Sequence, residues 1–181
     1  MRTLEKLRTK LLSPQPPEKK VSKYRLYKCT WQVGDVYAYR LESEYSKEKG
    51  LYGKYIIFQK VGETDCWPGH IIPIVVVYRW IGAEIPRMEE LRKLEFLNQI
   101  RPVSLMGRTQ EECYHRELVC ESEKKIPVTQ LILLGNQKPR EKTVLKKGRC
   151  NCMGWEKTKI NWTIEKETID LYLAWQEHDN A

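Results

Sequence analysis

The chain has 181 residues, of which 41% are hydrophobic and 31% are charged, and its formal net charge is +8 at pH 7. A chain of this length and composition can form one globular domain with a substantial core. The longest apolar run, 71–77, is interrupted by Pro73 and falls far short of the roughly 20 residues that span a bilayer. Membrane insertion is therefore not expected.

The N-terminal residues and the cysteines indicate the compartment. The N-terminal stretch up to Pro17 is basic and lacks the apolar core of a signal peptide, which predicts a cytoplasmic location. The six cysteines are irregularly spaced. In a cytoplasmic protein we expect them to be reduced thiols rather than a disulfide framework.

The positive charge is unevenly placed. Residues 1–28 carry a net charge of +7, residues 137–159 carry +6, and the remainder carries −5. Two basic segments on a mildly acidic body predict an electrostatic footprint for nucleic acid or for an acidic protein surface. The alternative is a solvated tail and a lysine-rich loop that serve solubility.

The N-terminal region is expected to form a separate arm. Leu4, Leu7, Leu11 and Leu12 recur at helical spacing, which predicts a short amphipathic helix that ends at the Pro-rich stretch 13–17. Such a helix is too short to be stable alone. We expect a basic helix and Pro-rich linker over 1–23 and a single β-rich domain over 24–181.

Three stretches between Cys29 and Tyr78 are rich in β-branched and aromatic residues, as strands are. They predict strands over 36–41, 55–61 and 71–78. A charged connection over 42–50 and a turn over 62–65 separate them, and Pro73 favours an edge position or a bulge. Consecutive strands of this kind predict a small antiparallel barrel or a strongly bent sheet.

The rest of the chain mixes helix and strand patterns. The pattern predicts a short helix over 88–94 and strands over 96–105, 113–120 and 128–134. Residues 160–176 are expected to be a C-terminal helix, because Asn161 can cap it and acidic residues follow in its first turn. Alternating apolar residues leave a hairpin as the alternative. The fold class expected is α+β.

Three segments carry a resemblance to known proteins. They are WQVGDVYAY from Trp31, KGLYGKY from Lys49 and WPGHIIPIV from Trp67. They resemble an uncharacterised family of small proteins of Gram-positive gut bacteria and their phages. The opening Trp-x-x-Gly-Asp-Val is also similar to the start of SH3-like barrels in immunity proteins of toxin systems. The resemblance implies an SH3-like barrel and brings no active site with it.

A looser similarity is to anti-CRISPR proteins, which are phage-carried inhibitors of RNA-guided nucleases. It rests on size, basic charge and phage context rather than on a motif. These resemblances imply a non-enzymatic phage or mobile-element accessory protein that binds DNA or a nucleoprotein. The alternatives are an immunity-type protein that neutralises a toxin by binding, and an enzyme that uses His70 and Cys66. The oligomeric state stays open.

The candidate contacts are basic and aromatic side chains. Tyr37, Tyr39 and Tyr52 are candidates for a protein interface, with core packing as the alternative. The loop after Gln137 is dense in cations and flanked by Gly and Pro, which favours phosphate contacts. With the N-terminal arm, the candidates for nucleic-acid binding are Lys6, Arg8, Lys10, Lys19, Lys20, Lys138, Arg140, Lys142, Lys146, Lys147 and Arg149.

Catalysis and metal binding have weaker support. Cys66 and His70 are close in sequence, but a nucleophile and its base are recognised by spatial geometry. No cofactor is expected. Zinc is left open, because the spacing matches no common zinc motif although soft ligands are present: Cys113, His115, Cys120, Cys150 and Cys152.

Overall fold

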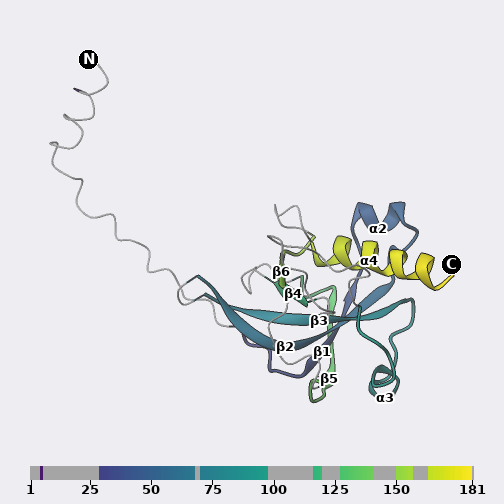
Figure 1. The fold of residues 1–181 in the computed structure, drawn as a ribbon, viewed down its shortest axis with the longest axis horizontal. Helices are drawn as coiled ribbons and strands as arrows, with labels where there is room; N and C mark the ends of the chain where they lie inside the picture. The colour runs from purple at the N-terminus through teal and green to yellow at the C-terminus, as the bar shows by residue number, and fades with distance from the viewer. Residues whose placement is uncertain are drawn as a thin grey trace.

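A computed structural model describes residue 5 and residues 29–67, 70–97, 116–119, 127–140, 150–156 and 163–180. Its helices are α2 (Glu44–Glu48), α3 (Met88–Leu91) and α4 (Ile164–Asp179). Its strands are β1 (Asp35–Arg40), β2 (Tyr55–Trp67), β3 (His70–Gly82), β4 (Arg116–Val119), β5 (Leu131–Asn136) and β6 (Cys150–Met153). The six strands form one sheet in the order β5-β1-β2-β3-β4-β6 (Figure 1).

The sheet confirms the predicted α+β class, with one departure from an all-antiparallel arrangement. Four of its neighbouring pairs are antiparallel, whereas β4 and β6 run parallel. A parallel pair needs a long connection, and about thirty residues separate these two strands in the sequence. Among the described residues no ladder joins the edge strands β5 and β6, so this sheet is open. The SH3-like barrel stays a prediction.

β2 and β3 form the longest pair and bend along their length (Figure 1). The predicted turn over 62–65 is wrong, because β2 continues through it to Trp67 and Gly62 pairs with Ile74. Three register shifts interrupt this pair, and such bulges increase local twist and bending. Pro73 was predicted to mark an edge position or a bulge; it pairs in register with Glu63, and the nearest register shift lies between Lys60 and Gly62.

Both faces of the sheet are covered, because successive side chains of a strand point to opposite faces. α4 covers one face and α3 packs on the other (Figure 1). The α4 face buries an aromatic cluster of Tyr37, Tyr39, Phe58 and Trp155. The α3 face buries aliphatic residues and Tyr78 with Leu91 of α3.

The predicted C-terminal helix is confirmed as α4, and the hairpin alternative is wrong. The cap is Thr163 rather than Asn161: its hydroxyl accepts from the Lys166 N–H at 3.2 Å. Glu165 and Glu167 follow in the first turn, where the helix dipole favours negative charge. The connection over 42–50 also contains a helix, α2, capped by Ser43.

Other predicted elements are confirmed in part. The short helix over 88–94 is α3, and β5 begins at Leu131 rather than at 128 because residues 127–130 form a turn. The strand over 113–120 is described only as β4, and that over 96–105 only as a bridge between Phe96 and Tyr78. The predicted N-terminal helix lies outside the described residues except for Glu5.

Candidate nucleic-acid interface

The structure describes two of the eleven basic candidates, Lys138 and Arg140, which follow β5. Lys138 is exposed and Arg140 is half-buried. The other nine lie outside the described residues: Lys6, Arg8, Lys10, Lys19, Lys20, Lys142, Lys146, Lys147 and Arg149.

Arg140 anchors the start of the basic loop to α3. Its guanidinium donates to the carbonyl oxygens of Leu91, Arg92 and Leu94 at 3.2, 2.8 and 2.7 Å. It also lies 4.7 Å from the ring centroid of Phe96, within the range of a cation–π contact. These carbonyls belong to the end of α3 and the turn after it, where the Leu91 carbonyl also accepts from the Leu94 N–H. Arg140 is thus committed to the chain's own backbone, which suits an anchor better than a phosphate contact.

A buried lysine anchors residues 29–31, which follow the N-terminal basic segment. Lys60 in β2 is fully buried, and its Nζ donates to the Trp31 carbonyl and to a Glu63 carboxylate oxygen. Its Nζ also lies 3.6 Å from the Cys29 Sγ. Burial raises the pKa of the Cys29 thiol, which keeps it neutral and a poor nucleophile. The cluster therefore serves as an anchor for residues 29–31.

The turn at Gly34, which follows the N-terminal basic segment, lies beside Gln137, the first residue of the second basic segment. The Gln59 side-chain amide donates to the carbonyls of Gly34 and Gln137, at 3.3 and 2.7 Å. The Gln137 N–H donates to the Gly34 carbonyl at 3.0 Å. Asn136 joins the same turn by donating to Asp35 at 2.9 Å and to the Val33 carbonyl at 3.1 Å. Residues about one hundred positions apart thus form one junction.

The described body is acidic. Its residues from Cys29 onward include 13 Lys and Arg and 17 Asp and Glu, a net charge of −4. Because the whole chain carries +8, the positive excess lies in the segments that border this body. α4 and its cap contribute five of the acidic residues and a single lysine.

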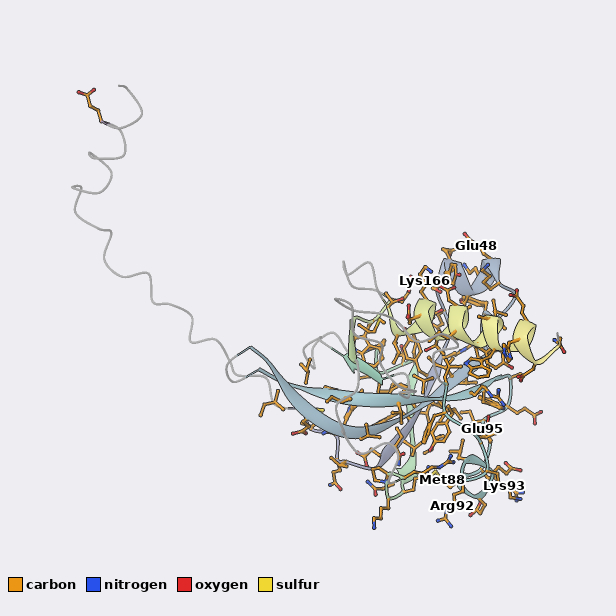
Figure 2. The ribbon with its side chains drawn as sticks, in the orientation of Figure 1. Glu48, Met88, Arg92, Lys93, Glu95 and Lys166 are labelled. Atoms are coloured by element: carbon orange, nitrogen blue, oxygen red, sulfur yellow. The ribbon has the colours of Figure 1, made fainter. Side chains whose placement is uncertain are left out.

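Two exposed cations beside the Arg140 anchor were missed from the sequence. Arg92 and Lys93 follow α3 and project from the end of the molecule opposite Glu48 and Lys166 (Figure 2). Their position depends on Arg140, whose Nη2 binds the Arg92 carbonyl. Since α3 and the basic loop are far apart in sequence, only the fold could bring these charges together.

The structure corrects the interface assignment of two tyrosines. Tyr37 and Tyr39 share a face, as their spacing predicts, but that face lies under α4 and their exposed fractions are 8% and 0%. Burial raises the pKa of both phenols. Tyr52 is 49% exposed, with the Lys47 ammonium 5.0 Å from its ring centroid. Of the three, Tyr52 alone presents a large surface to a partner.

Sequence reasoning also missed a buried carboxylate. Glu165 of α4 is fully buried and accepts from the Ser43 N–H at 3.0 Å and from the Ser43 hydroxyl at 2.5 Å. The Tyr39 hydroxyl donates to its second oxygen at 3.5 Å. These partners come from distant segments, so no local pattern could reveal them. The cluster fastens α4 to α2 and β1, and all its donors are internal.

The described residues add little to the catalytic and zinc hypotheses. Cys66 lies in β2, and His70 begins β3 in register with Trp67. Cys150 and Cys152 lie in β6, whereas Cys113, His115 and Cys120 lie outside the described residues. In the part of the chain that the structure describes, no group of three or more His, Cys, Asp or Glu residues is placed to hold a metal ion.

Comparisons with protein-family models, with curated proteins and with solved structures found no match. No helix in the described ranges is both long and apolar enough to cross a membrane.

Proposed function

We propose that the protein binds nucleic acid, or a nucleoprotein such as an RNA-guided nuclease, through its two basic segments, and that it acts by occupying its target rather than by catalysis. The junction built on Gln59 carries this proposal. Because Gly34 and Gln137 are held together there, charges that are distant in sequence can act on one polyanion.

The charge of the body supports the same function. A polyanion is attracted by the basic segments and repelled by a body whose net charge is −4. This asymmetry orients the ligand toward the junction and away from the acidic α4 face. A lysine-rich tail that only served solubility would not need two anchors on the body.

The candidate residues then have separate roles. Arg140 and Lys60 position the segments, since both are bound to backbone carbonyls. Arg92 and Lys93 add two exposed cations beside the loop, among the exposed carboxylates of Glu89, Glu90 and Glu95. The phosphate contacts themselves come from the basic candidates of the arm and the loop: Lys6, Arg8, Lys10, Lys19, Lys20, Lys138, Lys142, Lys146, Lys147 and Arg149.

The biological setting is part of the proposal. We place the protein in the cytoplasm as a phage or mobile-element accessory protein, with the blocking of an RNA-guided nuclease as its specific role. The bulged β2–β3 pair supports the relation to SH3-like barrels. An immunity-type protein would bind an acidic toxin instead, and it would bind that partner without affinity for nucleic acid.

The test is fluorescence anisotropy with duplex and single-stranded DNA across a salt series. We expect a triple variant, in which Lys146, Lys147 and Arg149 are each replaced by Ala, to bind DNA more weakly. The slope of log K against log salt should fall in magnitude by about 0.9 per lost phosphate contact. The matched control is Lys47, Lys49 and Lys54→Ala, which removes three positive charges near α2, remote from α3 (Figure 1). Equal losses in both variants would contradict a localised basic site.

A further inference from the structure

Exposed apolar side chains gather at one edge of the sheet. The described residues expose five large hydrophobic side chains, and four of them lie in β5 or beside it: Val33 at 51%, Val128 at 75%, Ile132 at 42% and Leu133 at 57%. Val33 is held at the end of β5, because Asn136 donates to its carbonyl. Such a concentration at one edge indicates an interaction surface.

β5 is an edge strand whose outer side has free pairing groups among the described residues. It pairs with β1 alone there, and the bond from the Arg40 N–H to the Gln130 carbonyl sets the alternation of the ladder. Ile132 therefore turns its backbone groups toward Ala38 of β1. Leu131 and Leu133 turn theirs to the open side.

The sequence of β5 lacks the charges and prolines that commonly protect such an edge. Natural edge strands carry lysines, prolines or other charges that prevent pairing with another chain. Between Lys125 and Lys138 this chain has no charged residue, and β5 itself contains no proline. An uncharged strand has no charge with which to attract an oppositely charged partner. It can pair with the same strand of a second copy, because that pairing brings no like charges together.

We propose that β5 pairs antiparallel with β5 of a second copy of this chain, about a two-fold axis at Ile132. Leu131 then exchanges backbone hydrogen bonds with the partner subunit's Leu133, and Leu133 with the partner subunit's Leu131. Ile132 packs directly against the partner subunit's Ile132. Exposed Leu133 gains an apolar neighbour on the α4 face and exposed Ile132 gains one on the α3 face.

In this register residues 131–133 of the two β5 strands pair with each other, and residues 134–136 of each strand face the turn over 128–130 of the other. The register places the turn that carries Val128 opposite the end of β5, next to which Val33 is held, so all four exposed side chains border the interface. Residues 131–133 of two strands form a contact that is small beside the roughly 1,200–2,000 Å² that stable interfaces bury. The dimer is therefore reversible and dissociates on dilution. It joins two sheets into one and does not depend on nucleic-acid binding.

The test is sedimentation equilibrium of the full chain, without nucleic acid, over a concentration series. We expect a monomer–dimer equilibrium that Ile132→Lys weakens by tenfold or more, because two lysines would then face each other on the axis. Glu48→Gln, which also raises the net charge by one but lies on α2, should leave the equilibrium unchanged. A wild-type chain that stays monomeric at every concentration would overturn the proposal.

A rescue separates loss of pairing from loss of folding. Ile132→Glu should also be monomeric, and mixing it with Ile132→Lys should restore a dimer that holds one copy of each. Hydrogen exchange gives a second readout, since the Leu131 and Leu133 amides should gain protection as concentration rises. If the mixture stays monomeric, β5 does not pair with its copy. The same conclusion follows if the Leu131 and Leu133 amides are equally protected at all concentrations, because a segment of the same chain would then cover them.

Discussion

At the scale of single residues, the structure places several polar groups in the core and gives each a specific partner. Glu165 is the clearest case, because an unpaired buried carboxylate would be very costly. Its hydrogen bonds to Ser43 and Tyr39 connect α4 with the loop before α2 and with β1. This residue therefore contributes to the attachment of the C-terminal helix.

We predict that Glu165→Leu lowers the free energy of unfolding by about 2–4 kcal/mol, because the Ser43 N–H and the Tyr39 hydroxyl lose their acceptor in the core. Glu165→Gln keeps an oxygen in place and should cost about 1 kcal/mol. Urea denaturation measures both. Glu177→Leu, on the exposed end of α4, is the control and should change stability by less than about 0.5 kcal/mol. Similar losses for Glu165→Leu and Glu177→Leu would disprove the role of the buried cluster.

Buried phenols make the fold sensitive to alkali. Burial raises the pKa of Tyr78 to about 12, whereas an unfolded chain releases this proton near pH 10. The folded state thus holds a proton that the unfolded state loses, so the free energy of unfolding falls as the pH rises from about 10 to about 12. The raised pKa values of Tyr37 and Tyr39 act in the same direction.

We expect the urea midpoint to fall between about pH 10 and about pH 12, and Tyr78→Phe to make that fall shallower by removing one of the titrating groups. Tyr78→Phe also loses the hydrogen bond from the Gln137 amide, which changes stability at every pH. The change in its urea midpoint is therefore measured relative to its own midpoint at neutral pH. A midpoint that stays constant over this range in the wild-type chain would mean that these phenols titrate alike in both states.

At the scale of elements, the turn before β1 is the part on which the junction depends. Gly34 has φ of +99°, a conformation that L side chains rarely adopt. A Cβ built on Gly34 would lie 2.7 Å from the Gln137 carbonyl oxygen. The glycine therefore permits the close approach of the two chain segments that carry the basic regions.

We predict that Gly34→Ala costs about 2–4 kcal/mol and weakens DNA binding, because it combines backbone strain with a backbone clash at the junction. Gly50→Ala is the matched control. It shares a positive φ, +68°, but no atom lies within 4 Å of its Cβ position, so a cost of about 1 kcal/mol is expected. Thermal unfolding and anisotropy measure the two effects. If Gly34→Ala keeps the stability and the DNA affinity of the wild-type chain, neither depends on the turn at Gly34.

The element patterns in the sequence predicted much of the fold. Runs rich in β-branched and aromatic residues identified the strands that became β1, β2 and β3, and the acidic first turn identified α4. The continuation of β2 through 62–65 was missed, since Gly and Asp there resemble a turn while cross-strand pairing with β3 extends the strand. The parallel β4–β6 pair was missed because it depends on a return of the chain from the far edge of the sheet.

The candidate site was predictable in charge but not in geometry. The sequence located the basic segments, yet it could not tell which cations serve as anchors. Arg140 and Lys60 bind carbonyls supplied by distant segments, and those pairings appear only in the fold. Likewise, alternation showed that Tyr37 and Tyr39 share a face without showing that α4 covers it.

At the scale of the whole molecule, the described body is acidic and both faces of its sheet are covered, and Gly34 meets Gln137 at one junction between β1 and β5. The order of strands makes this possible, because β5 returns to lie beside β1, the first strand of the chain (Figure 1). The same arrangement leaves β5 as the outer strand. The pairing of β1 with β5 thus creates both the junction for the basic segments and the edge proposed for self-association.

The most direct test of the central claim is whether the arm and the loop act on the same nucleic acid. DNA affinity and salt slope should be measured for the wild-type chain, for Lys19 and Lys20→Ala, for Lys146 and Lys147→Ala, and for the combined variant. One shared surface predicts that each pair lowers the slope by about 1.8 and that the combined loss is about 3.6, with unchanged stoichiometry. A slope that neither pair changes would contradict the account.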